Sequence, residues 1–339
     1  MFQTKVMPCD EKGVAFAAEL LKKGEVVGIP TETVYGLAAS AYDPAAVSKI
    51  FAAKGRPQDN PLIVHISDLS MLNDLVSDFP PIAQKLASAF WPGPLTMILP
   101  KSERVPFEVT AGLDTVGIRM PSHPGAAAVI KACGLPLAAP SANTSGRPSP
   151  TKAKHVLYDM NGKIPLILDG GSCSVGVEST VILVKKDSVH LLRPGGVTEK
   201  DIESLGIIVT VDPAVETKLK QNAKVLSPGL KYKHYSPKAE VVIVKGSFDQ
   251  FKEYVSHKTE DGVFVLVFEG EDKLVNWPAV VYGKKSDPKA QAAGLFDALR
   301  EVDERGARLV YARCPDQDGV GYAVYNRLLR AAAFKVVEV

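Results

Sequence analysis

One stretch of the chain divides its 339 residues into two parts, each long enough to bury a core of its own. Between Glu216 and Glu240 there is no acidic residue, and six lysines lie there together with Pro228, Gly229 and Pro237. Such a change in composition is typical of a segment between domains. On both sides of this segment, short apolar runs alternate with helix-like runs. The sequence therefore predicts two α/β domains.

The first predicted domain covers residues 1–206 and has a twisted mixed sheet. Residues 43–55 are expected to form a helix, because Asp43 can cap it, Pro44 suits its first position and Gly55 can end it. Further helices are expected near residues 80–90, 122–132 and 151–159. The strand candidates are "EVVGIP", "PLIVHI", "LTMIL", "TVGIRM", "PLAAP", "IPLILDGG", "STVILV" and "VHLLRP".

The pattern restarts beyond the linker at residues 207–237. Residues 238–339 are expected to form a smaller, doubly wound, Rossmann-like parallel domain. Its strand candidates are "AEVVIV", "GVFVLVF", "PAVVYG" and "ARLVYA", and its helix candidates are residues 287–306 and 321–333.

The composition limits where the protein can act and which partners it can bind. The formal net charge of +2 gives no bulk attraction for nucleic acid or membrane. No apolar run has the length of a transmembrane helix, and the first residues lack the apolar core of a signal peptide. The four cysteines are scattered without metal-ligand spacing, which indicates reduced thiols. We therefore expect a cytoplasmic protein.

Standard catalytic and nucleotide motifs do not occur. The sequence contains no GxxxxGK[ST] phosphate loop, no HExxH and no GxSxG. The segment "GVGYAV" at 319–324 follows a strand and opens a helix, but it lies too near the end of the sequence for a dinucleotide fold, so we interpret it as helix packing. The sequence thus provides neither a nucleophile with its base nor a metal cluster.

Polar loops at strand ends are the remaining candidates for a site. They are "PTETVYG" at 30–36, "KGRPQDNPL" at 54–62, "PSANTSGRPSPT" at 140–151, "GVEST" at 176–180 and "LRPGG" at 192–196, with Arg119 in an apolar strand. Taken singly, the first could be turn and cap chemistry, and Lys54 and Arg56 could be solvated surface charges. Together, these hydroxyl, amide and basic groups would suit an anionic ligand.

These loops carry a resemblance to a known family. The set "PTETVYGLAA", "KGRP.DNPL", "GIRMP", "APSAN.SG.PSPT", "DGG", "GVESTV" and "LRPGG" resembles the YrdC-type threonylcarbamoyl-AMP synthases. The linker "SPG.KY.HY.P" and the later "GVG.A..NRL..AA" are similar to the two-domain form of that family. Leu230, Lys233 and Ser236 stand where Met, Arg and Ala are often seen.

The resemblance implies a nucleotidyltransferase reaction. L-Threonine, bicarbonate or CO2 and ATP would give L-threonylcarbamoyl-AMP and pyrophosphate, with Mg²⁺ carried by ATP and with no dedicated carboxylate ligand that can be named. The product would serve a downstream tRNA threonylcarbamoyl transferase, which modifies the adenosine next to the anticodon. In-line attack on the α-phosphate chiefly needs positioning and neutralisation of charge, which Arg and Lys provide.

The resemblance also implies the site residues. L-Threonine is expected at Thr33, His65, Arg119, the Ala139 backbone and Ser179. Lys54 and Arg56 are the expected catalytic residues, with Lys54 and Asn143 near phosphate or bicarbonate. ATP is expected at Arg56, Asn60, Thr115, Ser141, Asn143, Ser149, Arg193 and Tyr235.

The linker raises a separate question. Residues 227–237, "SPGLKYKHYSP", carry rings and cations that a plain tether does not need. We expect an ordered flap over the N-terminal site, with Tyr235, His234 and Lys231 or Lys233 facing the nucleotide. A basic, disordered tether is the alternative, and the sequence leaves both open.

Two other function classes remain as alternatives. One is a double-stranded RNA or tRNA-binding module, and the near-neutral charge argues against tight RNA binding, so at most weak binding is expected. The other is a carbamoyl transferase of the hydrogenase-maturation kind, against which the absence of any CxxC pair counts.

Overall fold

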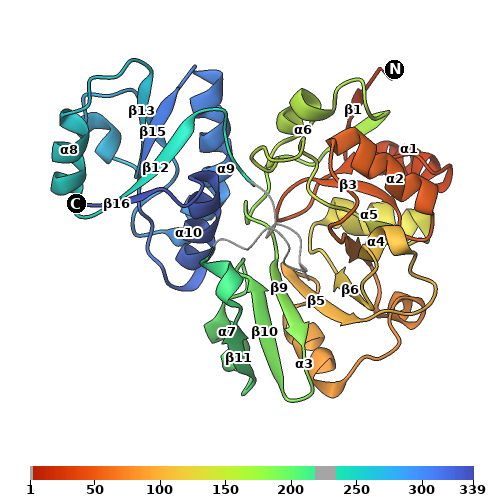
Figure 1. The fold of residues 1–339 in the computed structure, drawn as a ribbon. Coiled ribbons are helices and arrows are strands. Elements are labelled where there is room, and N and C mark those ends of the chain that lie inside the picture. The colour runs from red at the N-terminus through yellow and green to blue at the C-terminus, as the bar shows by residue number, and fades with distance from the viewer. Residues whose placement is uncertain (1–2, 218–233) are drawn as a thin grey trace. The chain divides into compact units, whose positions relative to one another are not determined.

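The computed structural model describes residues 3–217 and 234–339, which form two compact units (Figure 1). The first unit takes in the chain up to Ser145, Pro150–Ser174 and the residues from Glu178 into the linker. The second takes in the remainder, including two short segments that precede the linker, Gly146–Ser149 and Val175–Val177. The predicted domain boundaries at 206 and 237 stay predictions, and the first sheet itself continues to Val211.

The first unit contains an 11-stranded mixed sheet in the order β1-β8-β2-β3-β7-β4-β6-β5-β9-β10-β11. Its strands are β1 (Lys5–Pro8), β2 (Val27–Ile29), β3 (Gly36–Ser40), β4 (Ile63–His65), β5 (Leu95–Pro100), β6 (Thr115–Arg119), β7 (Leu137–Ala138), β8 (Leu166–Asp169), β9 (Thr180–Val184), β10 (Ser188–Arg193) and β11 (Ile208–Val211). The expected mixed α/β fold is confirmed.

The helices of this unit begin and end where local chemistry allows. In α2, Asp43 accepts hydrogen bonds from the amides of Ala45 and Ala46, and Gly55 ends the helix with a φ of 62°. This confirms the helix expected at 43–55. The helical elements are α1 (Glu11–Lys22), α2 (Pro44–Lys54), η1 (Leu69–Asp74), α3 (Pro81–Phe90), α4 (Phe107–Thr110), α5 (Pro124–Cys133), α6 (Ala153–Met160), α7 (Glu199–Glu203) and η2 (Pro213–Val215).

Pairing directions in the middle of this sheet decide where polar groups meet. β4 and β6 are parallel, so their carboxyl ends, His65 and Arg119, lie opposite each other. β5 is antiparallel to β6 and parallel to β9, so the beginnings of β5 and β9 come to the same edge. There Thr96 lies opposite Arg119. A mixed sheet thus gathers two strand ends and two strand beginnings at one edge.

The second unit has a parallel sheet in the order β14-β13-β15-β12-β16, with α8 on one face and α9 and α10 on the other (Figure 1). Its elements are β12 (Glu240–Lys245), α8 (Phe248–Ser256), β13 (Val263–Val267), η3 (Glu271–Leu274), β14 (Ala279–Val281), α9 (Pro288–Glu304), β15 (Leu309–Arg313), α10 (Gly319–Ala331) and β16 (Val336–Glu338). This is the expected parallel α/β domain.

The carboxyl end of β15 in this unit is closed by a buried arginine. Arg313 pairs with Glu271 at 3.2 Å and donates to the Gly246 carbonyl at 2.9 Å. Aromatic rings surround its guanidinium at 5.5 to 5.7 Å from their centroids: Phe248, Phe251 and Phe268. Ligands of open α/β sheets bind at such strand ends, and here a side chain of the protein occupies one of them.

Helix α9 also holds the two short segments that belong to this unit. Arg300 donates to the Pro148 carbonyl at 2.5 Å, and Arg147 lies 3.7 Å from Asp303. Gly176 has a φ of 79°, and a Cβ there would meet the Ala293 backbone at 2.3 Å. Only glycine allows this close approach.

Across the described parts of both units, no helix has the length and apolar character needed to cross a membrane.

Candidate functional site

A buried polar cluster lies where β4, β5, β6 and β9 meet in the first unit. Arg119 is 4% exposed, and its Nη1 donates to Thr33 Oγ1 at 2.8 Å while its Nη2 lies 2.7 Å from Glu32 Oε1. Burial alone would raise the pKa of Glu32, but the Arg119 guanidinium, together with hydrogen bonds from the backbone amides of Glu32 and Ser122, outweighs burial and holds that pKa below its ordinary value. The cluster therefore contains a buried, oppositely charged pair.

His65 lies beside this pair at the end of β4. Burial, and then the positive charge of Arg119, lowers the pKa of His65 from 6.5 to about 3, so the ring is neutral at physiological pH. Its Nδ1 lies 3.3 Å from the Ile63 carbonyl oxygen, which can only accept. This assigns the proton to Nδ1 and leaves Nε2 as an acceptor.

A hydroxyl pair extends the cluster to β9 and β10. Thr96 Oγ1 and Ser179 Oγ lie 2.8 Å apart. Arg193, at the end of β10, donates through Nε to the Ser179 carbonyl at 3.1 Å and through Nη2 to its hydroxyl at 3.2 Å. All three side chains are buried. Ser179 is therefore placed from two sides, by a strand neighbour and by an arginine.

Ala139 follows β7 and lies opposite Ile63, the first residue of β4. Its amide donates to the Ile63 carbonyl at 3.0 Å, so that donor is used within the sheet. If the Ala139 backbone meets a ligand, its carbonyl group is the one to consider.

Lys54, at the end of α2, joins this helix to the loop that follows Pro140. Its Nζ donates to the Ser141 carbonyl and to the Asn143 carbonyl, the latter at 2.8 Å. Ser141 Oγ in turn donates to Asn143 Oδ1 at 2.6 Å. Burial, with Arg56 nearby, lowers the pKa of Lys54 well below its ordinary range. Lys54 therefore fixes the loop, and its two bonds go to backbone rather than toward open space.

Arg56 and Asn60 lie together in the loop after α2. Arg56 Nη2 donates to the Asn60 carbonyl at 3.3 Å. Asn60 is fully buried, and neither atom of its side-chain amide has a hydrogen-bond partner among the described residues. A buried amide without partners is costly in a finished core, and it is common where a ligand completes the bonding.

Thr115 lies away from Arg119 on the same strand. The two occupy opposite ends of β6, and Thr115 pairs with Pro100. They are four residue steps apart along the strand, a separation of roughly 13 Å. Its expected role at ATP stays a prediction.

Two further predicted residues belong to the second unit. Ser149 is fully buried in the segment that α9 holds. Tyr235 is 5% exposed, has a φ of 62° and packs against the Phe296 ring at 5.3 Å, with Arg327 at 5.7 Å from its centroid. Lys231 and Lys233 lie outside the described residues, so the expected flap stays a prediction.

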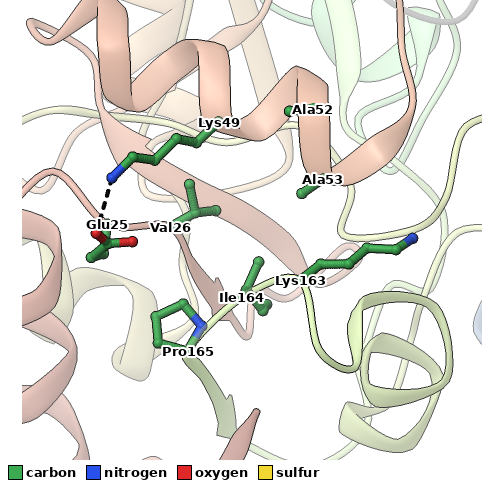
Figure 2. A pocket seen from close by; sticks show the side chains of 8 residues that line it. All are labelled: Glu25, Val26, Lys49, Ala52, Ala53, Lys163, Ile164 and Pro165. Atoms are coloured by element: carbon green, nitrogen blue, oxygen red, sulfur yellow. Dashed lines mark hydrogen bonds and ion pairs between the residues drawn. The ribbon is translucent and has the colours of Figure 1, made fainter. Parts of the chain in front are cut away.

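A hollow of about 420 Å³ lies elsewhere on the first unit, and none of the predicted site residues lines it (Figure 2). Lys49 and Lys163 border it, but Lys49 is paired with Glu25 at 2.9 Å and Lys163 donates to the Asp159 carbonyl at 2.9 Å. These cations are engaged within the protein and indicate no ligand.

The charges of the cluster limit its chemistry. In the described residues no three His, Cys, Asp or Glu side chains gather as a metal site. What gathers is two arginines, a buried glutamate, a neutral imidazole and several hydroxyls. Such a set can bind and orient a small molecule that carries both charges, and it can neutralise negative charge next to it.

Comparisons with known proteins agree with this geometry. A family model described as "Telomere recombination", named Sua5_yciO_yrdC, matches residues 19–195, and one described as "Threonylcarbamoyl-AMP synthase, C-terminal domain" matches residues 197–333. A threonylcarbamoyl-AMP synthase of Bacillus subtilis is 46% identical over 98% of this chain and 97% of its own. The chain belongs to the threonylcarbamoyl-AMP synthase family.

Other members of this family are similarly close. The threonylcarbamoyl-AMP synthase of Pyrococcus abyssi is 44% identical over 97% of each chain. The crystal structure of P. abyssi Sua5 complexed with L-threonine has a TM-score of 0.91 and 42% identity, and the match covers 100% of this chain and 99% of that one. The predicted resemblance and the two-domain fold of the family are thus confirmed.

The structure adds residues to the site that the sequence did not single out. Glu32 was noted in a polar loop without a role, and Thr96 was part of an apolar strand candidate. A single threonine in an apolar strand gives no signal of its own. Glu32 could have been found by asking which acidic residue would balance Arg119 if both were buried.

Proposed function

We propose that this protein makes L-threonylcarbamoyl-AMP and pyrophosphate from L-threonine, bicarbonate or CO2 and ATP, and that it belongs among the nucleotidyltransferases. The observation that carries the proposal is the buried cluster around Arg119. It brings together Thr33, His65 and Ser179, which the resemblance assigns to threonine. A relative that is 42% identical over its whole structure has been crystallised with L-threonine.

The threonine end of the proposed site follows from the unused bonding groups. Arg119 Nη1 donates to Thr33 and Nη2 lies 2.7 Å from Glu32, while Nε has no hydrogen-bond partner among the residues described. Each Nη carries two N–H groups, so a second N–H remains to act beside Nε. A guanidinium edge matches a carboxylate with two parallel hydrogen bonds. The Nε2 of neutral His65 can accept a hydrogen bond from a side-chain hydroxyl, and the Ser179 hydroxyl can accept one or donate one.

The ATP end of the proposed site rests on the loops after α2 and β7. The Asn60 amide has unsatisfied donors and acceptors, and Arg56 contacts the same residue. We propose that Arg56 and Asn60 contact the nucleotide directly. Lys54 then contributes by holding Ser141 and Asn143 in place, since its bonds go to their carbonyl groups.

The proposed chemistry needs no nucleophile from the protein. The threonine ammonium first loses a proton to solvent. The amine then adds to CO2 with release of a second proton, or to bicarbonate with loss of water, and gives a carbamate. A carbamate oxygen then attacks the α-phosphorus of ATP, and the bond to the β,γ-diphosphate breaks to release pyrophosphate. The protein supplies orientation and positive charge for this step.

Mg²⁺ is part of the proposal only as the ion carried by ATP. The polar groups near Lys54 include hydroxyls, amides and cations, which fit phosphate oxygens. The carboxylates of Asp159 and Glu178 are also close enough to act on the charge of Lys54, but the described residues offer no cluster of three metal-ligating side chains. When bound with ATP, the ion would neutralise phosphate charge.

The cellular setting is a proposal too. The product would pass to a tRNA threonylcarbamoyl transferase, and we propose that the protein acts in the cytoplasm. Weak direct binding of tRNA stays a prediction. A gel shift at near-physiological salt tests it, because contacts to phosphate weaken steeply as salt rises.

Pyrophosphate release tests the proposed reaction. The purified protein should release pyrophosphate only when ATP, bicarbonate and L-threonine are all present. L-Valine has the same shape without the hydroxyl and should be at least a hundredfold poorer, because the site's polar groups would be left unpaired. Equal release with valine, or release without bicarbonate, would contradict the assignment.

A further inference from the structure

Glu32 is a buried carboxylate that the reaction as described above does not use. It lies in the loop between β2 and β3, is 5% exposed, and its Oε1 is 2.7 Å from Arg119 Nη2. The backbone amides of Glu32 and Ser122 also lie close enough to the carboxylate to lower its pKa, but Oε2 makes no well-aligned hydrogen bond within the described part of the chain. A buried carboxylate can accept about four hydrogen bonds, so Oε2 keeps acceptor capacity that a ligand donor could use.

We infer that Glu32 binds the α-ammonium group of the amino-acid substrate whose carboxylate lies on Arg119. This assignment rests on the proposed function and deepens it, because it adds a specificity-determining residue to the same site. It also defines the substrate class more narrowly: the head group must be a zwitterion.

Charge complementarity supports the inference. Glu32 and Arg119 together are neutral, so a ligand with net charge gains nothing from the pair as a whole. A zwitterionic α-amino acid carries an ammonium and a carboxylate next to each other, as the protein carries a carboxylate and a guanidinium next to each other. Placed in opposite directions, the two dipoles satisfy all four charged groups.

The neighbouring groups do not compete for this role. His65 is neutral, since burial and then Arg119 lower its pKa to about 3. Burial, and then the charge of Glu32, raises the pKa of Cys173 to about 12, so the thiol is neutral as well. Thr33 holds the far side of the guanidinium through Nη1, which leaves Nε toward a ligand carboxylate and Oε2 of Glu32 toward a ligand ammonium.

Two ligands and two variants of the full-length protein separate binding from mere positioning. L-Threonine and (R)-3-hydroxybutyrate differ only in the α-ammonium group. Glu32→Gln should weaken L-threonine binding by about 10- to 100-fold, the range of a lost charge-assisted hydrogen bond. The same substitution should leave the affinity for (R)-3-hydroxybutyrate unchanged or increase it. The Glu32 carboxylate competes with the ligand carboxylate for Arg119, and Gln carries no charge with which to compete. NMR titration measures both affinities.

The outcomes are distinct. If the affinities for both ligands fall by the same factor, Glu32 only positions Arg119 and the inference is wrong. Glu32→Asp keeps the charge and provides the same comparison if Glu32→Gln does not fold. In this variant the affinity for L-threonine must fall more than the affinity for (R)-3-hydroxybutyrate. If the unchanged protein fails to bind L-threonine at all, the proposed function has failed rather than the role of Glu32 within it.

Discussion

The neutral state of His65 makes a prediction about acid stability. The ring is buried beside Arg119, and its folded-state pKa of about 3 lies below the ordinary value of 6.5. The folded protein therefore binds fewer protons than the unfolded chain between these two values. The stability that this residue contributes is fully present above pH 6.5 and is lost as the pH falls toward about 3. His65→Asn removes the titration and keeps an amide near the Ile63 carbonyl.

The size of the effect follows from these two pKa values. At pH 5 the folded ring is still neutral, and the unfolded ring is almost fully protonated. The loss is then roughly 1.5 pH units at 1.36 kcal/mol each, or about 2 kcal/mol. On going from pH 7.5 to pH 5, the unfolding free energy of the unchanged protein should fall by about 2 kcal/mol more than that of His65→Asn.

Urea unfolding at a series of pH values measures this difference. Other titrating groups contribute to both proteins, and the subtraction removes them as long as each unfolding transition is two-state with the same m-value. Any constant cost of the substitution also cancels, because only the change with pH is compared. Parallel curves for the two proteins between pH 7.5 and pH 5 would show that His65 is not held neutral and would refute the burial argument.

Three further substitutions test other parts of the site. Lys54→Met should lower the unfolding free energy by about 2 kcal/mol or more, because two buried or partly buried carbonyls lose a donor. Lys49→Met on the same helix breaks an exposed ion pair and an exposed hydrogen bond to the Gly24 carbonyl, and it should cost less than about 1 kcal/mol. Equal costs in urea unfolding would contradict the role of Lys54. Arg119→Lys should weaken the binding of L-threonine by about tenfold or more in calorimetry, because the planar two-pronged contact is lost, and it should leave the affinity for ATP unchanged. An unaltered threonine affinity would refute this role of Arg119. Tyr235→Phe keeps the ring packed on Phe296, so the variant should fold normally. Its KM for ATP should rise, because the hydroxyl that is expected to contact the nucleotide is gone. Unchanged kinetics would show that Tyr235 is only a packing residue of the second unit.

Alternation of apolar and helix-like segments predicted much of the fold. The strands expected in the second domain appear as β12, β13, β14 and β15, and the helices expected at 287–306 and 321–333 appear as α9 and α10. β1, β3, β11 and β16 were not predicted. β3, "GLAAS", has small residues without a strand pattern, and its pairing with β2 and β7 rather than its own propensity makes it a strand.

The site was predicted by resemblance more than by pattern. Loops far apart in the sequence reach one edge of the sheet because β5 and β9 begin where β4 and β6 end, and the order of strands in a mixed sheet is not written in local sequence. The same pairing brings Thr96 opposite Arg119. Burial also changed the interpretation of Lys54, which local sequence would leave as a solvated surface charge and which the structure places against two backbone carbonyls.

The fate of the carbon in bicarbonate tests the proposed reaction most directly. The protein is incubated with ATP, L-threonine and either ordinary or ¹³C-labelled bicarbonate, and the nucleotide products are analysed by mass spectrometry. We predict a threonylcarbamoyl adenylate whose mass increases by one neutron with the label, in an amount equal to the pyrophosphate released. Pyrophosphate with an unlabelled adenylate, such as threonyl-AMP, would contradict the account, because it would show that the threonine carboxylate rather than a carbamate attacks ATP.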